Sequence, residues 1–394
     1  METKLLLSSE APRGAGSPRS SRPLREEQPS VKVLVLVFTI SLTTLSALSA
    51  LQALVSHISS HYTATTYEVV VGLLMVSALP CAMLQFTFDA SYDTQFGLRD
   101  AAGFRLGLSC AVQSACCVAL VWQALPILYA SSFFIGVFTW IANGTLNSLC
   151  VAIAPKASIY QGLGFQVANL LSYGVIWSTE AGGWQLLWWV LAVFPLVGLA
   201  ASYVFLNDER VVALLRDYQE PRRQLTLRED VKRMPPSIQK MFLVEALSLT
   251  VSVIAVGATS FYEDEPNYLG TSLATGLYVA FTLGNVVSRI VTIYTSIPGD
   301  EFLLGGSLLR AALTPLLFFG DDLDSAADVY LVLFFFFFAL VGGVLIQIPF
   351  LLPKTKCAPE DVVLAGRFIN VAQGAGLTFG GLIDVAVAVG LIYA

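Results

Sequence analysis

Amides, hydroxyls and one arginine recur within apolar segments of this chain at the spacing of a single helical face. Thr139, Asn143 and Asn147 are four residues apart, and Asn285 and Arg289 repeat that spacing further along. Side chains three or four residues apart project from one side of a helix. Because polar groups that face lipid have no hydrogen-bond partners, such a stripe predicts a helix that lines a solute pathway.

Each polar stripe has a second interpretation. A single Asn or Gln in an apolar bundle can instead join two helices by a hydrogen bond worth about 0.6–2 kcal/mol. A purely structural core needs few such groups, so several stripes in one chain favour solute binding. The other polar residues on these stripes are Gln166, Asn169, Tyr173, Tyr278, Thr282, Thr292, Gln347, Asn370 and Gln373.

Arg289 carries the strongest of these signals. A charge in the middle of a membrane helix costs about 2.5–3.5 kcal/mol on insertion scales, so this side chain should face a polar cavity and have a partner. We expect that partner to be Glu245, Asp384 or a bound solute. The alternative is an ion pair whose only role is to hold two helices together.

The segments that carry these residues are too apolar for a water-soluble domain. Hydrophobic residues make up 56% of the 394 positions and charged residues only 13%, whereas about 25% is usual in soluble proteins. Runs of about 20 apolar residues recur, without the alternation of barrel strands, and predict an all-α polytopic membrane protein. The eleven predicted spans are 33–55, 67–88, 104–124, 127–154, 158–178, 184–206, 238–261, 270–296, 302–319, 328–352 and 363–393.

A charged connection over residues 207–239 divides the spans into a six-helix half, 32–206, and a five-helix half, 240–394. This 6+5 arrangement resembles the major facilitator fold. Residues 1–31, rich in Ser, Pro, Arg and Glu, predict a disordered cytosolic tail. Lys and Arg crowd that tail and the connections after even-numbered spans, while the opposite connections have none. The positive-inside rule therefore predicts a cytosolic N-terminus and a C-terminus on the opposite side.

Sequence motifs of enzymes and of cofactor sites are missing. The chain has no Gly-rich phosphate loop, HExxH pair or GxSxG elbow, and none of its six cysteines has a metal-ligand spacing. We therefore expect no catalysis, no cofactor and no bound metal. The net charge of −6 argues against nucleic acid as a partner. The expected partners are the lipid bilayer, a small-molecule substrate and, for a coupled carrier, the proton.

Motifs spread over most of the chain resemble those of the equilibrative nucleoside transporter family. The segment 281–289, FTLGNVVSR, has the frame of the family's F-N-x-x-D-x-x-G-R pattern in the eighth span. Arg310 followed by 315–316 (PL) is similar to the R-x-x-x-x-P-L of the ninth span, and 143–146 (NGTL) is similar to the Q-G-S-L of the fourth. The chain thus resembles a diverged member of this family.

The resemblance implies solute contacts from the second, fourth and eighth spans. In two places the chain departs from the family. Asn285 replaces the family's Asp, which removes a carboxylate that would neutralise Arg289, and residues 46–51 lack the P-W-N of the first span. The expected solute-binding residues, from the resemblance and the stripes together, are Ala78, Cys81, Thr139, Asn143, Asn147, Gln166, Phe281, Asn285 and Arg289.

The predicted function is transport of nucleosides, nucleobases or both by alternating access, as a facilitative uniporter. Amide linings suit uncharged purines and pyrimidines, because Asn and Gln both donate and accept hydrogen bonds. The alternatives are a diverged carrier of another small polar metabolite and a non-transporting membrane scaffold or receptor. We expect the plasma membrane as its location, with an endosomal or lysosomal membrane as the alternative because Glu2 with Leu6 and Leu7 resembles an acidic dileucine signal.

Overall fold

A computed structural model describes nine stretches of the chain, in which all regular structure is helical. The described stretches are residues 29–54, 57–58, 61–179, 183–217, 231–262, 273–295, 298–318, 326–358 and 361–393. The helices of the first part are α1 (Val31–Ala53), α3 (Ala64–Val76), α4 (Ala78–Phe96), α5 (Leu98–Leu120), α6 (Leu125–Ile153), α7 (Pro155–Thr179), α8 (Gly183–Leu206) and α9 (Glu209–Asp217). The second part has α11 (Pro236–Ala258), α12 (Leu273–Tyr294), α13 (Asp300–Leu313), α14 (Ala326–Gln347), α15 (Pro353–Lys356) and α16 (Val362–Tyr393).

The ends of several helices follow from the local sequence. The hydroxyls of Ser30 and Thr63 accept hydrogen bonds from backbone amides three residues on and so cap α1 and α3. Gly97 has a φ of +86°, which ends α4 and allows α5 to begin at the next residue. A proline at the second position of the 3₁₀ segments Thr314–Phe318 and Ile348–Leu351 lacks the amide hydrogen that would continue α13 and α14.

Ten helical segments of the described residues are long and apolar enough to cross a membrane. They coincide with ten of the eleven predicted spans, and α3 and α4 together form the second, as the segment Thr66–Asp89. The predicted fifth span is α7, which has 25 residues but is less apolar than the others. Its polar residues are sheltered because α7 packs against α1, α6 and α12. The prediction of a polytopic all-α membrane protein is confirmed.

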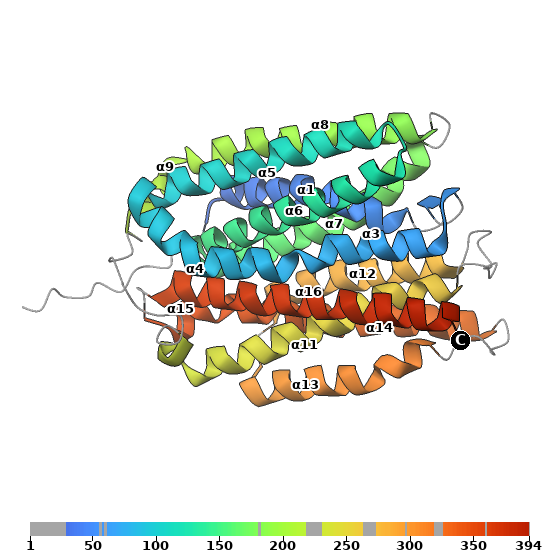
Figure 1. Cartoon of the computed structure of the whole chain (residues 1–394). Helices are drawn as coiled ribbons and strands as arrows, with labels where there is room; N and C mark the ends of the chain where they lie inside the picture. The colour runs from blue at the N-terminus through green and yellow to red at the C-terminus, as the bar shows by residue number, and fades with distance from the viewer. Residues whose placement is uncertain are drawn as a thin grey trace, which may run out of the picture.

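The helices run side by side in two packed groups (Figure 1). In the first, α1, α5, α6, α7 and α8 contact one another; in the second, α11 packs with α13 and α14, and α12 packs with α14. The groups meet along two seams. One is formed by α16, which lies against α11 on one side and against α3, α4 and α6 on the other, and the second by α7 with α12. A site that belongs to both groups must lie between these seams.

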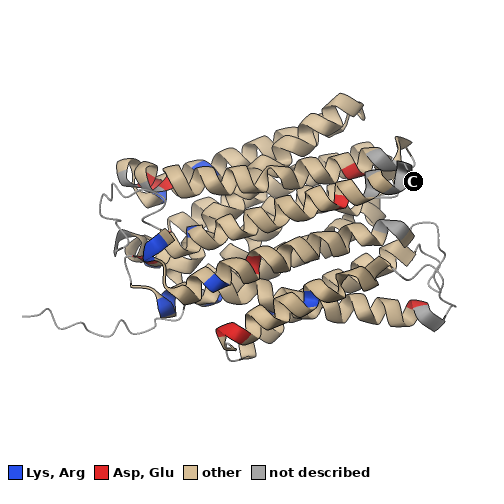
Figure 2. Cartoon of the chain, turned by 60° about the horizontal axis from the view of Figure 1, so that its bottom comes forward, with Lys and Arg blue, Asp and Glu red and all other residues tan. Residues whose placement is uncertain are grey.

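Most of the described Lys and Arg residues lie at one end of the bundle, opposite the marked C-terminus (Figure 2). We call this the basic end. There Lys32 Nζ lies 2.9 Å from Asp208 Oδ2, which joins the start of α1 to the end of α8. Lys354 Nζ donates to the carbonyl oxygen of Ile153 at 3.2 Å, which joins α15 to α6. The positive-inside rule predicts that this end faces the cytosol.

The predicted charged connection at 207–239 contains structure of its own. Helix α9 buries Val211 and Leu215 against the core formed by α1, α5, α6 and α8. Residues 218–230 of the connection, and 1–28 of the predicted tail, lie outside the described residues. Helix α1 already begins at Val31, and α11 begins at Pro236, four residues before the predicted second half.

Candidate functional site

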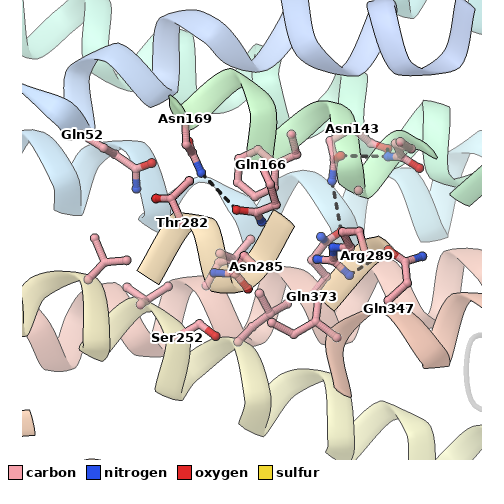
Figure 3. Close-up of a pocket in the computed structure, with 18 of the residues that line it drawn as sticks. Gln52, Asn143, Gln166, Asn169, Ser252, Thr282, Asn285, Arg289, Gln347 and Gln373 are labelled. Carbon is pink, nitrogen blue, oxygen red and sulfur yellow. Dashed lines mark hydrogen bonds between the residues drawn. The ribbon is translucent and has the colours of Figure 1, made fainter. Parts of the chain in front are cut away.

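A cavity lies between the two helix groups. Figure 3 shows Gln52, Asn143, Gln166 and Asn169 on one side and residues of α11, α12, α14 and α16 on the other. Aromatic rings join the lining, namely Trp140, Phe165, Tyr278, Phe281 and Phe350. The other polar lining residues are Asn147, Ser158, Gln161, Ser252, Thr282, Asn285, Arg289, Gln347 and Gln373.

Two amides of α6 link the first helix group to α16 at one edge of this cavity. Asn143 Nδ2 and Asn147 Nδ2 donate to Gln373 Oε1 at 3.1 and 3.0 Å. Asn147 Nδ2 also donates to Asn370 Oδ1 at 2.8 Å, and Gln161 Nε2 donates to Asn143 Oδ1 at 2.9 Å. These bonds are of the helix-joining kind, so part of the polar lining has a structural role. A residue of these stripes can therefore join two helices through one of its atoms and offer another atom to the solute.

Arg289 is the one charged side chain among the described residues that line the cavity. It is buried, and its Nη1 donates to Gly343 O at 2.9 Å and to Gln347 Oε1 at 2.7 Å, both on α14. Its expected carboxylate partners are placed differently. Glu245 is within electrostatic range of Arg289 but makes no hydrogen bond within the described chain. The carboxyl of Asp384 lies against α11 near its far end.

Several polar atoms around the cavity have no hydrogen-bond partner within the described part of the chain. They include two acceptors, Gln161 Oε1 and Asn169 Oδ1, and one charged donor, Arg289 Nε. Ser158 Oγ, which can do both, is also unpartnered. Buried polar atoms are rarely left in this state, because each loses its hydrogen bonds to water without compensation. The cavity therefore offers donors and acceptors together to a small polar ligand.

Six of the nine predicted binding residues line this cavity. They are Asn143, Asn147, Gln166, Phe281, Asn285 and Arg289. Asn285 Nδ2 donates to Phe281 O in its own helix at 3.2 Å, which leaves its Oδ1 near Gly343 of α14. The structure thus brings together the candidates from the fourth, fifth and eighth predicted spans.

The other three predicted residues lie outside it. Thr139 Oγ1 accepts a hydrogen bond from Gln113 Nε2 at 3.1 Å, which ties α6 to α5 within the first group. The Cys81 thiol points to the carbonyl of Val137 at 3.7 Å, between α4 and α6. Ala78 lines a separate small cavity between α4, α6 and α16.

Some of the lining residues were not among the predicted ones. Gln52, Trp140, Ser158, Gln161 and Ser252 are in the cavity wall. A signal was present on α7, where Ser158 and Gln161 are three residues apart and so are Gln166 and Asn169. A signal was present on α1 and α11 too, because Gln52 lies three residues after Ser49 on α1 and Ser252 lies four residues after Ser248 on α11.

Contacts join helices at both ends of the bundle. Away from the basic end, the rings of Tyr173 on α7 and Tyr278 on α12 lie with centroids 5.2 Å apart. At the basic end, Asp93 on α4 pairs with Arg367 Nη2 on α16 at 2.6 Å and also bonds to Arg105 on α5. Any movement that opens one end must break the contacts there.

Solved structures of other proteins identify the fold of this chain. No family model and no curated protein matches the sequence. The human organic anion transporter MFSD10 (TETRAN) has a similar structure, with a TM-score of 0.65 at 14% identity over 90% of this chain and 93% of that one. The major facilitator superfamily proton:xylose symporter XylE, bound to 6-bromo-6-deoxy-D-glucose, has a TM-score of 0.64 at 13% identity over 92% and 89%. The chain therefore has the polytopic fold of major facilitator superfamily transporters, as predicted.

Proposed function

We propose that this protein is a membrane carrier of nucleosides or nucleobases that works by alternating access, at the plasma membrane. The observation that carries the proposal is the cavity between two helix groups, where donors and acceptors without a partner among the described residues lie beside aromatic rings. Carriers of this type bind their solute between two bundles and expose it to either side as the bundles rock.

The charge of the cavity argues against a cation and against a nucleotide as the solute. Arg289 is its only charged lining residue among those described. A cation would be repelled by this side chain, and a nucleotide would bring several phosphate charges that one arginine cannot balance. Uncharged bases and sugars present carbonyls, ring nitrogens and hydroxyls, which match Arg289 Nε, Gln161 Oε1 and Asn169 Oδ1 as partners.

The aromatic rings favour a planar solute. Trp140, Phe165, Phe281 and Phe350 all line the cavity. Stacking of a base on an aromatic side chain contributes about 1–3 kcal/mol in proteins that bind single-stranded nucleic acids. A purine or pyrimidine would gain this stacking energy, whereas a linear polar metabolite would not.

The resemblance to equilibrative nucleoside transporters adds support at two positions. The residues at the Asp and Arg positions of the family's eighth-span motif, Asn285 and Arg289, both line the cavity. With Asn in place of the family's Asp, Arg289 is instead held by Gln347 and by the carbonyl of Gly343. We propose on this basis that the chain is a diverged relative of that family.

A sugar or another polyhydroxylated metabolite is the second candidate. Amide-rich linings also hydrogen-bond to hydroxyl groups, and XylE, whose fold this chain shares, is a proton:xylose symporter. The aromatic rings are compatible with either solute. The two candidates differ in whether a free base competes for the site.

Uptake into proteoliposomes tests the proposal. We expect saturable uptake of labelled adenosine, uridine or hypoxanthine, reduced by an excess of unlabelled nucleoside or base and unaffected by xylose. Inhibition by xylose alone would favour the sugar candidate. Correctly inserted protein that transports none of the three labelled solutes would contradict the proposal, and fluorescence imaging of tagged protein in cells tests its location.

Gly162 provides a sharper test of the site. A Cβ at this position would lie 2.4 Å from Gln347 Oε1 and 3.1 Å from Arg289 Nε. Gly162→Ala should therefore displace the Gln347 acceptor from Arg289 and weaken uptake roughly 10–100-fold, as expected when a hydrogen bond to a charged group worth about 1.5–3 kcal/mol is lost. The substitution should stabilise the helix itself by up to about 1 kcal/mol, because alanine has a higher helix propensity than glycine.

Gly174→Ala on the same helix is the matched control. A Cβ there meets no atom of the described residues within 4 Å. We expect this variant to show wild-type uptake in the same proteoliposome assay. Equal uptake by both variants would show that the contact between Arg289 and Gln347 is unimportant for solute binding.

A further inference from the structure

One buried carboxyl group has no role in the site as described so far. Glu245 lies on α11 with none of its surface exposed, and neither of its oxygens has a hydrogen-bond partner among the described residues. Asp93, a buried acid at the basic end, is instead bonded to Arg105 and Arg367. The environment of Glu245 thus differs in kind from that of an acid in a structural ion pair.

Two arginines on neighbouring helices face this region of α11. Arg289 on α12 interacts electrostatically with Glu245. Arg310 on α13 donates to Ser248 O at 2.8 Å and to Ser252 Oγ at 3.0 Å, about one and two turns from Glu245. The guanidinium of Arg310 is held by these bonds, whereas Arg289 has an unpartnered Nε within the described chain.

The other ionisable groups on helices packed against α11 lie elsewhere along it. Asp384 on α16 lies beside the far end of α11, about three turns from Glu245. Arg367, also on α16, is engaged at the basic end. Lys240 and Glu301 form an exposed ion pair where α11 begins. Arg289 is therefore the charged group best placed to respond to Glu245.

The two protonation states of Glu245 have different consequences for the cavity. An ionised carboxylate without hydrogen-bond donors is unfavourable in an apolar interior, so the packing described here suits the neutral acid. When the proton leaves, the negative charge attracts the guanidinium of Arg289. That attraction competes with the bonds that hold Arg289 to Gln347 at the cavity wall.

We propose that Glu245 is the binding site of a proton that is transported together with the solute. This inference rests on the proposed function and replaces the uniport expected from the sequence with proton-linked symport. A proton from the acidic compartment adds to a carboxylate oxygen of Glu245, and the O–H bond breaks again when the site faces the other compartment. Protonation leaves Arg289 free to bind the solute, so each ligand strengthens the binding of the other.

The test uses proteoliposomes with the full chain, loaded near pH 7.5 and diluted into buffer about two pH units more acidic. The probe is whichever of adenosine, uridine or hypoxanthine the wild-type protein exchanges without a gradient. We expect transient accumulation above the external concentration, up to about 100-fold for one proton per solute because each pH unit is a tenfold ratio of proton activity. A dye inside the vesicles should report acidification that depends on the solute.

Glu245→Gln mimics the neutral acid. It should therefore preserve solute exchange but abolish the coupling of solute transport to protons. We expect this variant to exchange solute across the membrane without a gradient, within about threefold of wild type, because the amide keeps the shape and neutrality of the protonated side chain. Accumulation and solute-dependent acidification should be lost. Glu301→Gln, which alters an exposed acid, and Asp384→Asn, which alters the other buried acid near α11, should retain both.

Each outcome has a distinct meaning. Wild-type uptake that only equilibrates and ignores the pH gradient would overturn this inference and leave the proposed function intact. Accumulation that persists in Glu245→Gln but disappears in Asp384→Asn would place the proton site at Asp384 and also overturn it. Absence of exchange with every solute in the wild-type protein would overturn the proposed function, and the inference with it.

Discussion

Replacing Arg289 with alanine is expected to abolish measurable uptake while the protein still folds and enters the membrane. The substitution removes the donors to Gly343 and Gln347 together with the unpartnered Nε at the cavity. Loss of a charged donor costs about 1.5–3 kcal/mol per hydrogen bond, so loss of several should lower the apparent affinity by more than about 100-fold. Initial rates of uptake at low solute concentration measure the effect.

Two further variants define the reason for that loss. Arg289→Lys keeps the charge but not the planar fork of donors, so we expect partial uptake between the alanine variant and wild type. Arg99→Ala removes an exposed arginine that bonds to Asn207 at the basic end and should leave uptake unchanged. If neither variant of Arg289 yields folded protein, the residue serves to join α12 to α14 and is not part of the solute site.

Removal of the Asp93 carboxylate is expected to give the largest loss of stability in the chain. Asp93→Asn removes the negative charge that α5 and α16 share through Arg105 and Arg367, all three side chains being largely buried, while Asp89 still pairs with Arg105. Breaking a buried ion pair by removing one partner costs about 3–5 kcal/mol, because the remaining charge stays buried. We expect a lower thermal midpoint in detergent and faster backbone hydrogen exchange in the adjoining ends of α4 and α16.

Arg367→Gln should be milder, since Asp93 keeps its bond to Arg105. The matched control is Lys32→Gln, which removes the ion pair with Asp208 near the same end. That pair is largely exposed on the lysine side, at 61%, and exposed pairs contribute about 0–1 kcal/mol. Equal thermal midpoints for Asp93→Asn and Lys32→Gln would contradict a role for Asp93 in closing the basic end.

These two predictions concern opposite requirements of a carrier. Arg289 must stay in place for the solute to bind, whereas the bond between Asp93 and Arg367 joins α4 to α16 and must break if that end is to open. A variant without this bond should therefore favour conformations open at the basic end. Hydrogen exchange should respond to the Asp93 substitution even where folded protein remains abundant.

The sequence by itself determined the class of fold. Long apolar runs in which backbone groups can be satisfied only within a helix predict the spans, and ten of them have the expected length and apolarity in the structure. Helical spacing also identified Asn143, Asn147, Asn285 and Arg289 as residues that avoid lipid. That inference is local, because the period of one helix decides which side chains share a face.

The tertiary structure decided which part of each polar face meets the solute cavity. Four residues advance a helix by slightly more than one turn, so successive members of a stripe rotate by about 40°. Over the eight residues from Thr139 to Asn147 this drift turns the first member towards Gln113 on α5 and the last towards α16. The partners of Arg289, Gly343 and Gln347, likewise follow from how α12 crosses α14, more than fifty residues further along the chain. Spacing within one helix contains no information about such a crossing, which depends on the packing of all the helices together.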